Sequence, residues 1–306
     1  MSNFLKDAPS IKATIIGQAS LVIWSLSACA TMALNDIPAF EILSGIFISG
    51  CIASSIINSI KGNWSFALKR PKYLIFAGIF GIAGNNILYV LSFKHAPAIQ
   101  VDLIVYLWPM MVLILSSLFL NEKTRINHIL ACVLAFSGVC ILLTANNDTS
   151  MFSAQYLIGY VLAFACALLW SIYVIISRRY NKSTPELFAI YSGVGAIFSL
   201  FMHFNFETTI MPSLWQGVIL VVMGVAAHSL AYYGWDFAIK RGHFKLLSIL
   251  PYGNPILSVL ALIFFGFADL TIEVLVSTLM VFAAGAIAGL KKPAKLVFQT
   301  EIKHPN

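Results

Sequence analysis

Charged residues are scarce in this sequence, and their scarcity excludes most soluble folds. Only 10% of the 306 residues are charged, whereas soluble domains carry about 25%. Hydrophobic residues make up 59% of the chain, and its mean hydropathy is +0.88. We therefore expect an all-α membrane protein whose bulk lies in lipid.

The usual signatures of catalysis and cofactor binding are absent as well. No Gly-x-x-x-x-Gly-Lys loop is present to hold a nucleotide. The five cysteines lie in apolar stretches without the paired spacing of a zinc or redox site, and the six histidines are scattered. Neither paired aspartates in adjacent stretches nor a Ser/His elbow occurs, so we expect no enzymatic activity, no metal and no cofactor.

Long apolar stretches make up most of the chain. A membrane-spanning helix needs about 20 mainly apolar residues, and we identify ten stretches of this kind, joined by short polar segments. They cover residues 11–34, 38–60, 73–92, 98–120, 126–144, 156–177, 186–204, 214–238, 245–266 and 271–290. The short connections leave no room for a soluble catalytic or nucleic-acid-binding domain.

The basic residues predict the orientation of these helices, because Lys and Arg concentrate in the cytoplasmic loops of membrane proteins. With the N-terminus in the cytoplasm, 18 of the 19 basic residues fall in cytoplasmic segments, and Lys94 is the exception. The outer loops carry acids instead, among them Asp36, Glu207 and Glu273. We therefore predict that both termini are cytoplasmic. The net charge of +7 then indicates topology and not a nucleic-acid partner.

The two halves of the chain resemble each other at an offset of 146 residues. This offset aligns Trp24 with Trp170, Lys94 with Lys240, Tyr106 with Tyr252 and Pro109 with Pro255. Each half, residues 1–146 and residues 147–306, holds five predicted helices, and because five is odd the second half enters the membrane inverted. Two inverted halves can open a central site to one side and then to the other, which is typical of transporters.

Prolines lie inside the fourth and ninth predicted helices, at matching places. Because proline has no N–H to donate, Pro109 and Pro255 should leave the carbonyls of Val105 and Pro251 without helical partners. Such carbonyls must face protein or a water-filled cavity. The matched breaks therefore indicate a binding site, with the two prolines as gating positions, although a plain packing kink is an alternative.

Aromatic residues deep within the apolar stretches are candidates for the lining of that site. Trp24, Trp108 and Trp170 lie away from the headgroup region in which tryptophan usually anchors a helix. Their rings could stack on an apolar or aromatic solute, although some aromatic residues must pack in the core or face lipid. The predicted substrate-binding residues are Trp24, Asn85, Tyr89, Asp102, Tyr106, Trp108, Trp170, His228, Tyr232 and Tyr252.

Three ionisable residues in the stretches have competing interpretations, since an ionisable side chain at bilayer depth costs about 2.5–3.5 kcal/mol on insertion scales. Asp102 either binds a substrate amine or a proton, or is solvated near the outer end of its helix. Asp236 is expected to pair with Lys240, four residues on. His228 is of a type that suits proton coupling, but we expect a hydrogen-bonded structural histidine.

The whole pattern resembles the drug/metabolite transporter superfamily, in particular its ten-helix EamA-type members. The strings Val-Ile-Trp24-Ser, Tyr106-Leu-Trp108-Pro109 and Ala-Leu-Leu-Trp170 are most similar to aromatic amino-acid exporters of the YddG type. The resemblance covers nearly the whole chain. It implies that the three tryptophans belong to a central cavity and that the protein occupies a bacterial inner membrane.

This sequence also departs from the exporter pattern, at Asn85-Asn86, Asp102 and Val105. The leading hypothesis is a carrier, most readily an exporter, of aromatic and other bulky neutral amino acids. The second is a proton-coupled exporter of cationic metabolites or drugs, with Asp102 as the carboxylate, and the third is a membrane scaffold that transports nothing. The expected partners are a small organic solute and the lipid bilayer, and the sequence leaves monomer and homodimer open.

Overall fold

The structure is a computed structural model that describes most of the chain. It covers residues 10–34, 36–62, 64–67, 69–120, 122, 124–144, 154–180, 182, 184–264 and 270–289. Regular secondary structure in these ranges is entirely helical, and no strand occurs among them. The predicted all-α class is therefore confirmed for the described residues.

The helices occupy the apolar stretches predicted from the sequence. In chain order they are α1 (Ile11–Met32), α2 (Ala39–Lys61), α3 (Trp64–Ala67), α4 (Lys72–Gly78), η1 (Ile79–Gly84), α5 (Asn85–His95), α6 (Ala98–Val105), α7 (Trp108–Phe119), α8 (Ile126–Thr144), η2 (Ala154–Tyr156), α9 (Leu157–Tyr180), α10 (Leu187–Phe206), α11 (Leu214–Val225), η3 (Ala226–Leu230), α12 (Ala231–Arg241), α13 (Phe244–Leu247), η4 (Leu250–Gly253), α14 (Asn254–Phe264) and α15 (Ile272–Gly289).

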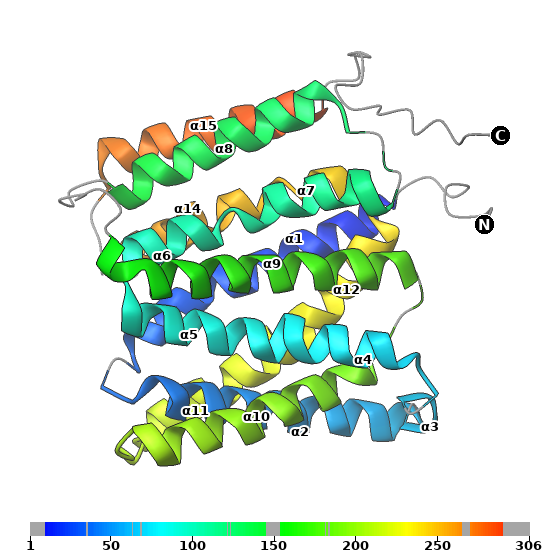
Figure 1. Cartoon of the computed structure of the whole chain (residues 1–306), viewed down its shortest axis with the longest axis vertical. Helices are drawn as coiled ribbons and strands as arrows, with labels where there is room; N and C mark the ends of the chain where they lie inside the picture. Colours follow the sequence, from blue (N-terminus) through cyan, green and yellow to red (C-terminus); the bar gives the residue numbers. More distant parts are fainter. Residues whose placement is uncertain are drawn as a thin grey trace.

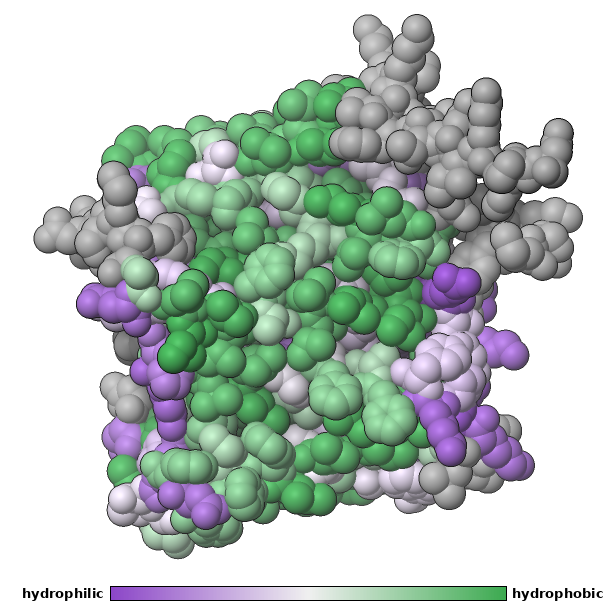
Figure 2. Space-filling view, viewed as in Figure 1, coloured by the Kyte–Doolittle hydropathy of each residue, from purple (hydrophilic) through white to green (hydrophobic). Residues whose placement is uncertain are grey.

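The outside of this helical bundle is apolar. Within the described residues, six stretches are long and apolar enough to cross a membrane: Ala39–Lys61, Lys72–His95, Gln100–Phe119, Ala154–Tyr180, Leu187–Phe206 and Leu214–Arg241. The shorter helical segments Ile11–Leu26, Ile126–Ile141 and Ile272–Ile287 are apolar as well. Figure 2 shows a broad hydrophobic face with hydrophilic residues gathered at two opposite ends. The protein therefore crosses the membrane several times.

Figure 1 shows the helices running roughly side by side in layers. At one side of the bundle α8 packs against α15, and at the other α2 packs against both α10 and α11. Between these layers α9 contacts α5, α6 and α7, while α1 contacts α12 and α14. Helices from the first and second parts of the chain thus alternate around the centre of the bundle.

Two of the long helices contain a π-helical turn. η1 joins α4 to α5, and η3 joins α11 to α12, without a break in either helix. Close packing explains the glycines around η1, because a Cβ atom on Gly78 would overlap the ring of Tyr191 and one on Gly81 would overlap Tyr173. Neighbouring helices therefore approach closely at these glycines. Gly285 of α15, by contrast, faces open space.

The helices that contain Pro109 and Pro255 are each divided in two. A turn at Tyr106 and Leu107 separates α6 from α7, and η4 precedes α14. Each proline is the second residue of the helix after the break, where a missing N–H costs nothing. The predicted interruption at both prolines is therefore present, although each proline lies in the first turn of the following helix and not at mid-helix. The carbonyl of Pro251 also has a partner, because it accepts a hydrogen bond from the backbone N–H of Asn254.

Candidate functional site

A cavity of about 320 Å³ lies at the centre of the bundle. Nine of the ten predicted binding residues line it: Trp24, Asn85, Tyr89, Asp102, Tyr106, Trp108, Trp170, His228 and Tyr232. Its other lining residues are Asn86, Val105, Cys166, Met223, Ala227 and Asn254. The lining residues lie on α1, α5, α6, α7, α9, α11, η3, α12 and α14 and in the turn at Tyr106. Side chains far apart in the sequence therefore converge here.

Aromatic rings pack edge to face along one wall of the cavity. The ring centroids of Trp24 and Trp170 lie 6.1 Å apart, and those of Trp108 and Trp170 lie 5.9 Å apart. Tyr232 adds a further ring, 5.2 Å from Trp24 and 5.8 Å from Trp170. Edge-to-face contacts of this kind are preferred by aromatic pairs. The wall is therefore a preformed aromatic surface.

Hydrogen bonds to backbone carbonyls fix this wall. The indole N–H of Trp24 donates to the carbonyl of Ala227 at 3.0 Å, which joins α1 to η3. The Ser171 hydroxyl lies 3.1 Å from the carbonyl of Trp108 and so links α9 to the first turn of α7. Trp235, only 1% exposed, packs against both Trp24 and Trp108 and closes the aromatic cluster on its buried side.

A polar wall faces the cavity from α5 and α6. The hydroxyl of Tyr89 donates to Asp102 Oδ1 at 2.7 Å, across the short connection between these helices. The amide of Asn85 donates to the carbonyl of Cys166 at 3.0 Å, and that of Asn86 donates to the carbonyl of Ile82 at 2.8 Å. The two asparagines therefore add side-chain hydrogen bonds to backbone carbonyls of α9 and η1.

The surroundings of the His228 ring differ from those predicted. Both of its ring nitrogens are buried and have no hydrogen-bond partner among the described residues. Its ring instead packs edge to face on Phe47 and Tyr232, at centroid distances of 5.2 and 5.6 Å. The expected hydrogen-bonded structural histidine is therefore wrong, because the neighbours that α2 and α12 place against this ring are aromatic. The side-chain amide oxygen Oδ1 of Asn254 is also buried and has no hydrogen-bond partner in the described part of the chain.

Tyr252 is the predicted binding residue that does not reach the cavity. It is fully buried in a separate cluster with Leu113, Ala135 and Ala284, because η4 turns it toward α8 and α15. Pro109 and Pro255 do not line the cavity either, although their helix breaks position Trp108 and Asn254, which do. Asn254 was absent from the predicted set, yet the 146-residue offset aligns it with Trp108, and that alignment could have identified it.

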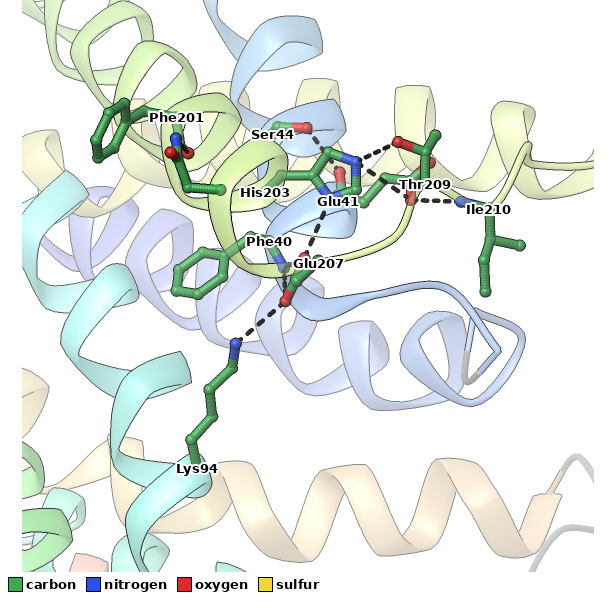
Figure 3. A network of polar contacts seen from close by, with 10 residues as sticks. Phe40, Glu41, Ser44, Lys94, Phe201, His203, Glu207, Thr209 and Ile210 are labelled. Carbon is green, nitrogen blue, oxygen red and sulfur yellow. Dashed lines mark hydrogen bonds and ion pairs between the residues drawn. The ribbon is translucent and has the colours of Figure 1, made fainter.

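One end of the bundle is closed by a polar network, here called the Lys94 end (Figure 3). Glu207 accepts a hydrogen bond from the backbone N–H of Phe40 at 3.0 Å and pairs with Lys94 Nζ at 3.3 Å. His203 lies between two carboxylates, with Nδ1 3.2 Å from Glu207 and Nε2 3.7 Å from Glu41. Glu41 stands in the first turn of α2 and contacts α10 through His203.

The opposite end, here called the Lys240 end, is closed by buried ion pairs. Lys240 Nζ lies 2.6 Å from Asp236 Oδ1, and both side chains are almost fully buried. The predicted Asp236–Lys240 pair is therefore present, but it is deeper than a helix-end pair at the surface. Arg178 of α9 pairs with Glu122 at 2.6 Å. Additional pairs at this end join Arg70 to Glu186 and Lys245 to Glu122.

Groups of three or more His, Cys, Asp or Glu side chains that could hold a metal ion do not occur among the described residues. The four cysteines whose side chains are described are all free. The cavity lining itself offers aromatic rings, hydrogen-bonding groups and the carboxylate of Asp102.

Comparison with known proteins identifies the family. Residues 11–144 match the EamA-like transporter family. The chain is 30% identical over 278 residues to the aromatic amino acid exporter YddG of Ancylobacter novellus, covering 91% of this chain and 97% of that protein. It is 25% identical to the aromatic amino acid exporter YddG of Escherichia coli K12, over 81% of this chain and 86% of the relative. A solved crystal structure superimposes with a TM-score of 0.85 at 29% identity, covering 91% of this chain and 96% of the other. Because the similarity to a named exporter extends over nearly all of both chains, this protein belongs to the EamA-like transporter family.

Proposed function

We propose that this transporter moves aromatic and other bulky neutral amino acids out of the cell across a bacterial inner membrane, and that it binds them in the central cavity. The observation that carries the proposal is the aromatic wall formed by Trp24, Trp108 and Trp170. Indole rings offer a large, rigid surface to another ring and little to a small polar solute. The amino-acid exporters among its relatives support the same substrate class.

The proposal includes an architecture of ten spans in two inverted halves, residues 1–146 and residues 147–306, with both termini in the cytoplasm. Features that recur at the 146-residue offset support it. The π-helical turns η1 and η3 nearly coincide after this shift, as do the breaks before Pro109 and Pro255. Two such halves could exchange conformations and expose the cavity to one side of the membrane at a time.

Liposomes that contain the purified protein provide the test. We would measure flux of radiolabelled tryptophan, phenylalanine, threonine and a lipophilic cation, with and without an imposed pH gradient. Saturable tryptophan or phenylalanine flux is expected, and Trp108→Ala should weaken it about tenfold or more, since burying an aromatic side chain contributes about 1.5–3 kcal/mol. Trp215→Ala is the matched control, because Trp215 is 69% exposed at the start of α11.

Each outcome has a defined meaning. Equal loss of flux in Trp108→Ala and Trp215→Ala would remove the cavity from the proposal. Flux of the lipophilic cation alone, and only with a pH gradient, would replace amino-acid export by proton-coupled cation export. Absence of flux for all four solutes would contradict the proposed substrate class. Vesicles of known protein orientation, loaded on either side, would test the direction.

A further inference from the structure

We propose that Asp102 and Tyr89 form an ammonium subsite within the cavity, so that the protein also takes arylalkylamines, which carry an aromatic ring and an amino group but no carboxyl group. This inference rests on the proposed function in one respect, since it places the solute in the same cavity. It differs in the group that is recognised. The amino group of the solute is held, and the carboxyl group is dispensable.

The geometry of Asp102 suits a cation of the solute. Asp102 lies in the first turns of α6, is half-buried and lines the cavity. The hydroxyl of Tyr89 donates to Oδ1 at 2.7 Å and so holds the carboxylate in place. Among the described residues, no Lys, Arg or His forms an ion pair with Asp102, whereas Glu41, Glu122, Glu186, Glu207 and Asp236 all have cationic or histidine partners. Asp102 therefore lacks the counter-charge that the other buried acids have.

The charge of the cavity lining favours a cation over an anion. Asp102 is the one carboxylate among the described lining residues, and none of them is Lys or Arg. Both ring nitrogens of His228 are buried and have no hydrogen-bond partner among the described residues, and a charged imidazolium in that position would be very costly. A neutral His228 leaves the fixed charge of the cavity negative.

Four polar donors of the lining are already used within the protein. The indole N–H of Trp24 donates to Ala227, the hydroxyl of Tyr89 to Asp102, and the amides of Asn85 and Asn86 to backbone carbonyls. A carboxylate of the solute would have to compete for these donors. An ammonium group meets a carboxylate and nearby aromatic faces, both of which attract a cation.

A set of three ligands that share the indole ring tests this inference. Tryptophan carries both groups, tryptamine carries only the amine, and indole-3-propionate carries only the acid. Binding of each radiolabelled ligand is measured by scintillation proximity on the full-length protein in detergent, because neutral tryptamine leaks across bilayers. We expect saturable binding of tryptamine and tryptophan, and much weaker binding of indole-3-propionate.

Variants locate the subsite. Asp102→Asn should weaken tryptamine binding by about tenfold to a hundredfold, the range expected when a hydrogen bond between charged groups is lost. Asp36→Asn is the matched control, because Asp36 is an exposed aspartate that contacts Gln216 away from the cavity. Tyr89→Phe keeps the carboxylate and should keep the preference for amine over acid. If Asp102→Asn does not fold, the ligand series on the unmodified protein still decides the matter.

The outcomes separate this inference from the proposed function. Binding of tryptophan and indole-3-propionate without tryptamine would overturn the ammonium subsite and leave amino-acid transport intact. Binding of tryptamine alone would support the subsite and contradict amino-acid transport. Equal tryptamine affinity in Asp102→Asn and the unmodified protein would overturn the subsite, and so would absence of binding for all three ligands.

Discussion

Lys94 and Lys240 are 146 residues apart and occupy opposite ends of the bundle, but the two ends hold them in different environments. The side chain of Lys94 is 39% exposed and lies 3.3 Å from Glu207. That of Lys240 is 2% exposed, pairs with Asp236 at 2.6 Å and also donates to the backbone carbonyl of Lys182. One lysine is thus a surface partner in a network, and the other is a buried charge that its neighbours must neutralise.

The difference between the two ends matches the position of the cavity. Along α5, the lining residue Tyr89 is five residues, or about 7.5 Å, from Lys94, given the helical rise of 1.5 Å per residue. Along α12, the lining residue Tyr232 is eight residues, or about 12 Å, from Lys240. The cavity therefore lies closer to the Lys94 end. The Lys240 end, with its buried ion pairs, is the end that lies farther from the cavity along these helices.

The largest expected effect comes from removing the buried lysine. Lys240→Ala should lower the free energy of unfolding by about 3–5 kcal/mol, because it leaves the carboxylate of Asp236 buried and unpaired. Lys94→Ala, the equivalent change at the other end, should cost at most about 1 kcal/mol, as is typical of an exposed pair. Denaturant titrations in the same detergent would measure both.

A double variant sharpens this comparison. Lys240→Met combined with Asp236→Leu removes both buried charges, and it should recover much of the stability that Lys240→Ala loses. Similar losses of unfolding free energy for Lys94→Ala and Lys240→Ala would show that the burial of the lysine does not distinguish the two ends.

A smaller effect is expected at Arg178, which also belongs to the Lys240 end. Arg178→Ala removes the pair with Glu122 and a hydrogen bond to the carbonyl of Ile239, but Lys245 stays 3.8 Å from Glu122. The remaining partner limits the loss of stability to about 1–3 kcal/mol. The same titration would measure it, with Arg179→Ala as the control, because Arg179 is exposed one residue further along α9. A loss as large as that of Lys240→Ala would mean that Lys245 does not compensate.

The smallest expected effect is a difference in salt dependence between the ends. At about 1 M salt the Debye length falls to about 3 Å, which screens exposed charges and leaves buried pairs nearly unchanged. The stability difference between Lys94→Ala and the unmodified protein should therefore vanish at high salt. The corresponding difference for Lys240→Ala should persist. An equal decline of both stability differences at high salt would contradict the burial of the ion pairs at the Lys240 end.

The helical fold could be predicted from the sequence because lipid imposes simple requirements. Each apolar stretch must satisfy its own backbone hydrogen bonds, and an α-helix does this without help from other segments. The π-helical turns could not be predicted in the same way. At η1 the surroundings include Tyr173 and Tyr191, which pack against Gly81 and Gly78 from helices distant in the sequence.

The candidate site was predictable to the extent that its residues are unusual at bilayer depth. Trp24, Trp108 and Trp170 are of that kind, and all three line the cavity. Tyr252 shows the limit of the approach. It aligns with Tyr106, but Tyr106 faces the cavity while Tyr252 is buried against α8, so aligned positions need not have equal surroundings. The environment of His228 likewise depends on Phe47, which approaches it from another helix.

The π-helical turns have a consequence for motion. A π-helical turn forms i→i+5 hydrogen bonds, one residue more than an α-helical turn, and one residue of an α-helix corresponds to about 100° of rotation. If η1 rewound into α-helix, α5 would rotate against α4 and turn Asn85 and Tyr89 away from the cavity together. η3 would do the same for Tyr232 on α12. Each wall of the cavity thus has side chains on a helix that contains a π-helical turn, and such a rewinding would change their facing without breaking that helix.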